Sequence, residues 1–197
     1  MAVALNVDPM LARPPRKRWT RTECELLDAA SFFYHYRCEL VDGTLISKSN
    51  NSEPHLLMLA ALVAWFGERF PSRGMVGSPL ESSCYGDLIS PPQPDLMVTK
   101  QPMDFGRTGW PQPEDVDILI EVAEADRLAF DTTVKAKLYA RGGVGDYWVI
   151  DVTANRVIVH REPQAEEYRI VRSYDETDAI YPLAATNLLF RLSDIPR

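Results

Sequence analysis

Two carboxylates stand where the chain could hold them rigidly. Glu121 lies inside the apolar run Ile118–Val122, and Asp95 directly precedes the apolar segment Leu96–Thr99. A charge flanked by apolar residues in a strand is costly to bury unless it is paired or bound to a metal ion. Carboxylate oxygens on rigid elements are suitable ligands for Mg²⁺. A glutamate that faces solvent from one side of a sheet, or that pairs with an arginine, would explain the same letters, so the pattern leaves both interpretations open.

The helices that must position these residues follow from caps and periodicity. A capping box at Thr20 predicts a first helix over residues 21–32. A second helix is predicted over residues 52–70, and it is so apolar around its circumference that it should pack between layers. A third is predicted over residues 131–141, with Asp131 as its N-cap.

The strands follow from β-branched enrichment, alternation and turn residues. They are predicted over residues 36–47 (a hairpin), 74–83, 96–99, 116–122, 147–152, 156–161 and 167–174. Strands joined by crossing helices indicate an α/β domain with a mixed central sheet flanked by helices.

Length and composition indicate one globular domain. The chain has 197 residues, 46% of them hydrophobic and 25% charged, which is ordinary for a soluble protein. We expect a flexible basic leader over residues 1–19 and one domain over residues 20–197. The start lacks the pattern of a signal peptide, and no apolar run reaches the roughly 20 residues that span a bilayer. The sequence therefore predicts a cytoplasmic protein without a membrane partner.

The charge balance bears on nucleic acid as a partner. The formal net charge of −7 weakens that interpretation, because affinity for a polyanion comes largely from Lys and Arg. A site that gathers carboxylates around a cation would still allow it, with basic residues lining only the groove beside it. The one obvious basic cluster is Arg13, Arg16, Lys17, Arg18 and Arg21, and a solvated leader would explain it equally well.

Several stretches together resemble a known family. They are Glu39-Leu40-Val41-Asp42-Gly43, Glu53-Pro54-His55, Gln93-Pro94-Asp95-Leu96, Leu119-Ile120-Glu121-Val122 and residues 131–151. In this order and spacing they are similar to the restriction-endonuclease-like (Uma-type) family widespread in bacteria, a branch of the PD-(D/E)XK nuclease superfamily. The resemblance covers roughly residues 20–190 and implies a single restriction-endonuclease-like domain.

The resemblance implies roles for three residues. Asp95 would be the aspartate of the Pro-Asp motif and Glu121 the acid of the second motif, both of them metal ligands. The superfamily's lysine normally follows that acid by two residues, but Ala123 stands there. Lys135 matches the position to which this branch relocates it. The alternative for Lys135 is a surface i,i+4 pair with Asp131.

Two further site members are implied with less support from the residues themselves. Glu39 looks like the additional N-terminal acid near the metal, although an exposed carboxylate at a strand edge explains it too. His55 could contact phosphate or a second carboxylate, but a lone histidine at a helix start is more often a capping or packing residue. Tyr139 and Trp148 are interpreted as core, because aromatic residues inside apolar runs usually pack.

The resemblance implies a function. The expectation is an endonuclease that uses Mg²⁺, or Mn²⁺, to hydrolyse phosphodiester bonds of DNA, with a homodimer as a modest expectation. The alternative is a catalytically inactive nuclease-fold protein that binds nucleic acid or a protein partner. The position of the Lys135 side chain separates the two, because an inactive protein has no need to turn it toward the carboxylates.

Overall fold

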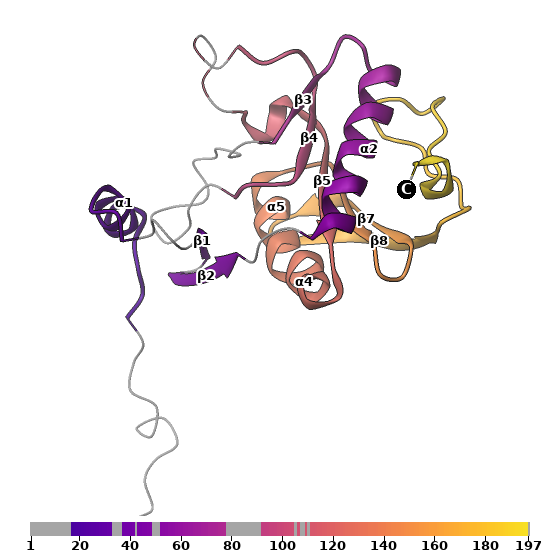
Figure 1. Cartoon of the computed structure of the whole chain (residues 1–197). Coiled ribbons are helices and arrows are strands. Elements are labelled where there is room, and N and C mark those ends of the chain that lie inside the picture. Colours follow the sequence, from indigo (N-terminus) through magenta and orange to yellow (C-terminus); the bar gives the residue numbers. More distant parts are fainter. Residues whose placement is uncertain are drawn as a thin grey trace, which may run out of the picture. The chain divides into compact units, whose positions relative to one another are not determined.

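The computed structural model describes residues 17–32, 37–41, 43–48, 52–77, 92–104, 106, 109 and 111–196. The chain divides into two compact units (Figure 1), one comprising residues 1–48 and 87–90 and the other residues 49–86 and 91–197. Each unit is described by itself. Most of the predicted leader lies outside the described residues, and the single domain over residues 20–197 stays a prediction.

The first unit contains a short helix and a hairpin, α1 (Arg21–Ala29), β1 (Arg37–Val41) and β2 (Thr44–Lys48). The predicted capping box is present: the Glu23 amide donates to Thr20 Oγ1 at 3.2 Å, and the Thr20 amide donates to Glu23 Oε2 at 3.0 Å. The helix ends at Ala29, three residues before the predicted end. The two strands pair antiparallel around Gly43, whose φ of 75° suits glycine in a tight turn.

The second unit is built on a six-stranded mixed sheet. Its strands are β3 (Gly74–Val76), β4 (Leu96–Thr99), β5 (Val116–Ala123), β6 (Asp146–Asp151), β7 (Arg156–Gln164) and β8 (Glu167–Asp175), in that spatial order. Neighbouring strands are antiparallel except β5 and β6, which are parallel. The predicted α/β class is confirmed. Beyond Gly77 the predicted strand over residues 74–83 lies outside the described residues.

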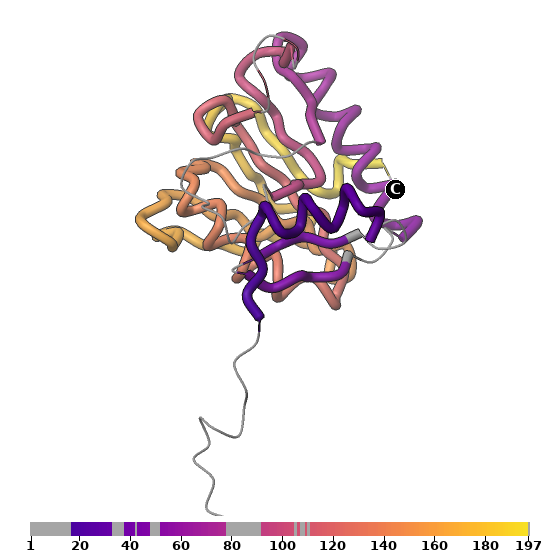
Figure 2. Tube along the Cα trace, turned by 90° about the vertical axis from the view of Figure 1, so that its left-hand side faces the viewer, coloured from indigo at the N-terminus to yellow at the C-terminus, as the bar shows by residue number. Residues whose placement is uncertain are grey.

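The sheet separates two apolar layers. On one face α2 (Glu53–Arg69) and the segment 180–195 contact it, as the purple helix and the yellow C-terminal segment of Figures 1 and 2 show. The other face is covered by α5 (Ala136–Gly142). Because side chains alternate along a strand, Ile120 and Val122 of β5 join the α2 layer. Glu121, between them, is thereby turned toward α5.

The helical connection from β5 to β6 differs from the predicted helix over residues 131–141. It begins earlier, with α4 (Ala125–Phe130), continues through a π-helical turn (Asp131–Lys135, hereafter the π turn) and ends with α5. The prediction of Asp131 as an N-cap was wrong, because its amide donates to the Arg127 and Leu128 carbonyls inside a continuing helix. The helix stops at Gly143, whose φ is 83°.

Asp146, at the start of β6, ties the C-terminal segment to the sheet. Its carboxylate accepts hydrogen bonds from Arg161 Nε at 2.8 Å, Trp148 Nε1 at 2.7 Å and the Leu183 amide at 2.9 Å. Farther along the segment, the buried Phe190 ring lies 5.1 Å from the Trp148 ring. The segment therefore completes the α2 layer although it contains no long helix or strand.

In the part of the chain that is described, every helix is too short or too polar to traverse a lipid bilayer.

His160 on β7 gives the fold a predicted dependence on pH. Its ring lies 5.0 Å from Tyr147 and 5.5 Å from Tyr168. Burial lowers the pKa of His160 below its ordinary value, whereas in the unfolded chain it titrates near pH 6.5. Below that pH the unfolded state binds more protons, so the folded state loses stability as the pH falls, by at most about 1.4 kcal/mol per pH unit.

A phenylalanine at this position keeps an aromatic ring but does not titrate. We therefore expect His160→Phe to lose less stability than the wild type between about pH 7 and about pH 5. Denaturant unfolding at each pH measures the two slopes. Equal slopes in the two proteins would mean that His160 does not carry this dependence.

Candidate functional site

Glu121 is the centre of a buried polar cluster on the α5 side of the sheet. Its Oε1 accepts a hydrogen bond from Lys135 Nζ at 2.8 Å and another from the Tyr139 hydroxyl at 2.5 Å. The side chains of Glu121 and Lys135 are only 3% and 6% exposed. Glu121, the acid inside an apolar strand, is thus paired. Its partner is Lys135, the lysine that the family resemblance indicated.

Asp95 adjoins this cluster from the neighbouring strand. The antiparallel register of β4 and β5 pairs Leu96 with Ile120, which places Asp95 beside Glu121. Asp95 Oδ2 accepts a hydrogen bond from the Val122 amide at 2.8 Å, so the two strands fix its carboxylate. The Asp95 side chain is 20% exposed, and the cluster therefore meets solvent at Asp95.

His55 lies against Asp95. Its Nε2 is 3.4 Å from Asp95 Oδ1, and its side chain is 8% exposed. Ser52 caps α2 by accepting from the His55 amide, which holds the imidazole at the start of the helix. His55 is therefore neither a cap nor an apolar packing residue, because its side chain contacts one of the predicted ligands.

The two carboxyl groups differ in their affinity for a proton. Burial alone would raise the pKa of Asp95, but the hydrogen bond and charge of His55, aided by the Val122 amide, hold it below the ordinary value. Burial, joined by the charges of Asp95 and Asp131 and opposed by the charge of Lys135, raises the pKa of Glu121 to about 8. A positive charge added between these acids would stabilise both as carboxylates.

Asp131 is a further ionisable member of the cluster. Its Oδ1 is 3.7 Å from Lys135 Nζ, in the i,i+4 relation that the alternative interpretation assigned to a surface pair. Both side chains are buried, however, and Lys135 also binds Glu121, so a surface pair is not what the structure contains. Lys137, two residues along, is exposed, in agreement with the choice of Lys135.

Glu39 lies on β1, in the first unit, where it is buried. It is therefore not the exposed strand-edge carboxylate of the alternative interpretation. Its predicted part in the metal site stays a prediction.

The cluster fits a magnesium ion through two carboxylates. Among the described residues no three or more His, Cys, Asp or Glu side chains are arranged to hold a metal ion. Mg²⁺ commonly keeps several water ligands and binds through one or two carboxylates together with substrate phosphates. Asp95 and Glu121 are such a pair, because the register of β4 and β5 places them side by side, and the cluster contains three acids, Asp95, Glu121 and Asp131, to one lysine.

Tyr139 is a site residue that the sequence interpretation missed. It was assigned to the core, and its ring is fully buried there. Its hydroxyl nevertheless donates to Glu121 Oε1. The available signal was the four-residue spacing of Asp131, Lys135 and Tyr139, which places successive side chains near one face of a helix.

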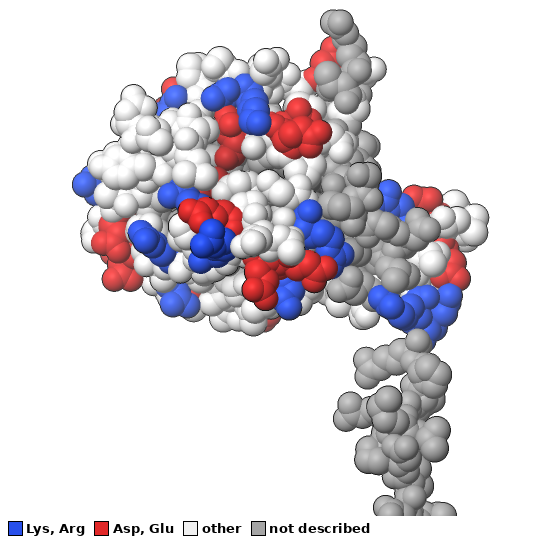
Figure 3. Space-filling view, turned by 180° about the vertical axis from the view of Figure 1, so that it is seen from behind, with Lys and Arg blue, Asp and Glu red and all other residues white. Residues whose placement is uncertain are grey.

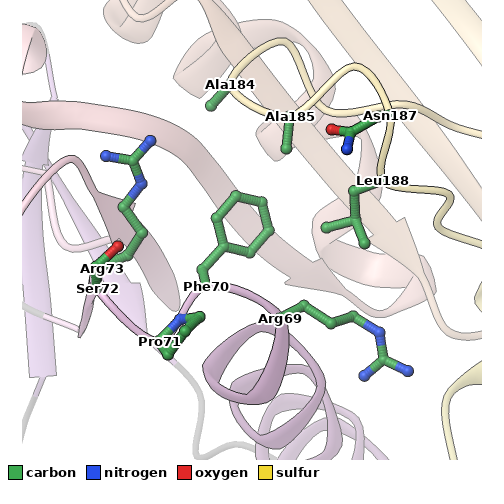
Figure 4. A pocket seen from close by; sticks show the side chains of 9 residues that line it. All are labelled: Arg69, Phe70, Pro71, Ser72, Arg73, Ala184, Ala185, Asn187 and Leu188. Atoms are coloured by element: carbon green, nitrogen blue, oxygen red, sulfur yellow. The ribbon is translucent and has the colours of Figure 1, made fainter.

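A separate open hollow of about 380 Å³ lies at the far end of α2, and Phe70 and Leu188 are among the residues that line it. Two guanidinium groups border it and lie apart on opposite sides of the Phe70 ring (Figure 4). Arg73 is engaged by Asp117 Oδ2 at 3.0 Å and by the Lys100 carbonyl at 2.6 Å. Arg69 donates to the Trp65 carbonyl of its own helix. These arginines serve the structure around the hollow, and the candidate site remains the Glu121 cluster.

Comparison with known proteins agrees with the motifs. The family model Uma2, described as "putative restriction endonuclease", matches residues 25–193. A crystal structure from Anabaena variabilis, described as a putative nuclease belonging to DUF820, superposes with a TM-score of 0.61 over 80% of this chain and 88% of that chain. The two sequences are 18% identical, so this likeness concerns the fold. No curated protein matches the sequence. Because the family model spans most of the chain, the predicted resemblance is confirmed, and the protein belongs to the Uma2 family of restriction-endonuclease-like proteins.

Proposed function

We propose that this protein is a Mg²⁺-dependent endonuclease that hydrolyses phosphodiester bonds of DNA. The observation that carries the proposal is the buried contact of Lys135 with Glu121, next to the partly exposed carboxylate of Asp95. Keeping Lys135, Glu121 and Asp131 out of water costs free energy. A buried ionisable cluster of this kind is typical of a functional site.

Each residue of the cluster has its own role in the proposed reaction. Asp95 and Glu121 would hold the cation, which when bound supplies Lewis-acid polarisation of the phosphoryl oxygen and activation of water. Lys135 would orient the attacking water and stabilise negative charge that develops on the phosphoryl group. His55 keeps Asp95 ionised and oriented, and Tyr139 shares Oε1 of Glu121 with Lys135.

The acidic composition does not contradict a DNA substrate. The net charge of −7 includes acids such as Glu121 and Asp131. These two are buried, so they are not part of the surface that DNA would contact. On the face shown in Figure 3, basic and acidic side chains are interspersed, so arginines and lysines are available beside acids. We expect binding to rely on few phosphate contacts and to depend weakly on salt.

The alternative of an inactive nucleic-acid-binding or protein-binding protein loses support. It predicts a Lys135 side chain directed to solvent, whereas Lys135 is buried against Glu121. A homodimer and a cytoplasmic location remain parts of the proposal that the following experiment does not need, whereas Mn²⁺ as a substitute ion is included in it.

The test is cleavage of supercoiled plasmid, linear duplex and single-stranded DNA with Mg²⁺, Mn²⁺ or EDTA. We expect wild-type cleavage that EDTA abolishes. Asp95→Asn keeps the size of the side chain and an acceptor for the Val122 amide, but it removes a charged ligand. We expect it to weaken Mg²⁺ binding, measured by calorimetry, by more than about tenfold and to reduce cleavage in parallel.

Asp126→Asn is the matched control, because this exposed aspartate in the first turn of α4 undergoes the same chemical change away from the cluster. It should behave as the wild type. Equal Mg²⁺ affinity in the wild type and Asp95→Asn, or a folded wild type inactive on every substrate, would refute the proposed enzyme.

A further inference from the structure

The π turn is the part of the chain that delivers Lys135 to Glu121. The Ala136 amide donates to the Asp131 carbonyl, five residues back, and also to the Thr133 carbonyl, three residues back, instead of to the carbonyl four residues back as in an α-helix. Such turns are rare and occur frequently at functional sites. An irregular backbone persists only where its surroundings hold it, so the groups that bond to the π turn determine where Lys135 lies.

Two of these groups are threonine hydroxyls of the turn itself. Thr132 Oγ1 donates to the Leu128 carbonyl at 2.7 Å, and Thr133 Oγ1 donates to the Ala129 carbonyl at 2.5 Å. In an α-helix these carbonyls would accept from the amides of the same two threonines. Hydroxyl groups that bond four residues back bend a helix. They favour the π turn locally but do not fix it relative to the sheet.

The third group comes from the sheet. The Tyr147 hydroxyl, on β6, donates to the Asp131 carbonyl at 2.8 Å, the same oxygen that receives the Ala136 amide. Tyr147 is fully buried. Its ring lies 4.9 Å from the Tyr139 ring and 5.0 Å from the His160 ring, so neighbours on both sides restrict its movement.

We propose that Tyr147 is a positioning residue for Lys135: its hydroxyl anchors the π turn to the central sheet and thereby sets the distance of the lysine from Glu121. The geometry supports a short chain of contacts. Tyr147 holds the first residue of the turn, Lys135 is its last residue, and Glu121 lies on β5, the strand paired with β6. The effect on cleavage rests on the proposed function, whereas the effect on the turn does not.

Tyr147→Phe removes only the hydroxyl, and the Asp131 carbonyl keeps its bond from Ala136. Tyr168→Phe is a matched control, since the Tyr168 hydroxyl also donates a buried hydrogen bond at 2.8 Å, to the Val144 carbonyl beyond the end of α5. A defect of general packing should affect both variants. A defect of the π turn should affect Tyr147→Phe alone.

Three measurements separate these effects. In Tyr147→Phe we expect the Ala136 amide to exchange with solvent at least about tenfold faster and the ¹⁵N signal of the Lys135 ammonium to shift. The chain has only five lysines, and Lys135→Met identifies this signal. With Mg²⁺ and plasmid DNA we expect kcat to fall by about tenfold to a hundredfold while KM stays unchanged, because a small displacement of a catalytic group is enough for such a loss.

In Tyr168→Phe the Ala136 exchange, the Lys135 signal and kcat should match the wild type. An unchanged Lys135 signal in Tyr147→Phe, or equal losses of kcat in the two variants, would overturn the proposal. If the wild type cleaves no substrate, the proposed function fails, and Ala136 exchange together with the Lys135 signal still decides whether Tyr147 holds the turn.

Discussion

Lys135→Met is expected to reduce Mg²⁺-dependent DNA cleavage by about a thousandfold, the size of effect seen when a charge-stabilising group is removed from an active site. The substitution keeps the length and apolar stem of the side chain and removes the ammonium that contacts Glu121 Oε1 at 2.8 Å. Both the charge and the fixed position of the carboxylate are lost. Single-turnover cleavage of plasmid DNA with saturating Mg²⁺ measures the chemical step.

Lys137→Met provides the control, because it removes the same charge two residues away from an exposed position. Its cleavage rate should equal that of the wild type. Cleavage by folded Lys135→Met at the wild-type rate would remove this lysine from the mechanism. A similar loss in both variants would indicate that overall charge, and not the buried contact, governs the reaction.

The same buried pair is expected to produce the largest effect on stability. Lys135→Met removes the ammonium that contacts Glu121 Oε1 at 2.8 Å and lies 3.7 Å from Asp131 Oδ1, and removing one partner of a buried ion pair costs about 3–5 kcal/mol. Adding Glu121→Gln removes the acid that has lost its lysine, while the amide oxygen can still accept from the Tyr139 hydroxyl. We therefore expect the double variant to be more stable than Lys135→Met alone.

Denaturant unfolding of the wild type, Lys135→Met, Glu121→Gln and the double variant gives a complete cycle. The two substitutions should be coupled by more than about 2 kcal/mol. Additive losses would show that the two side chains do not stabilise each other in the folded protein, despite their contact. The cycle requires no enzymatic activity, so it remains informative even for an inactive protein.

Glu121 shows what can be predicted from the sequence alone. A strand of apolar residues with one acid in it must bury that acid or turn it to solvent, and the alternation of β5 places it on the covered face. The strands, the extent of the second helix and the stop at Gly143 followed from local patterns in the same way. The expectation that this helix packs between layers was wrong, because Leu56 and Leu57 are exposed and only one side of α2 is buried. The contact between His55 and Asp95 could not, because 40 residues separate the two positions and only the packing of α2 on the sheet brings them together.

Asp131 and Tyr139 show where such prediction fails. Asp131 is an acceptable N-cap by residue type, and only the preceding turn of helix, Ala125–Phe130, reveals that it lies inside a longer one. The paired threonines that follow it were the local sign of an altered helix. Tyr139 was assigned to the core because its ring is buried there. The sequence pattern predicts the burial of the ring, but it does not predict the hydrogen-bond partner of the hydroxyl.

The hydrogen bond from the Leu183 amide to Asp146 has a consequence for folding during synthesis. A nascent chain leaves the ribosome at about 5–20 residues per second, and the residues from His55 to Tyr139 emerge before segment 180–195. Until that segment arrives, Trp65 and Trp148 lack their contacts with Phe190, at 4.9 and 5.1 Å between ring centroids. During this interval a chaperone that binds exposed aromatic side chains could bind these two tryptophans. The interval ends when the C-terminal segment packs on the sheet and the Leu183 amide donates to Asp146.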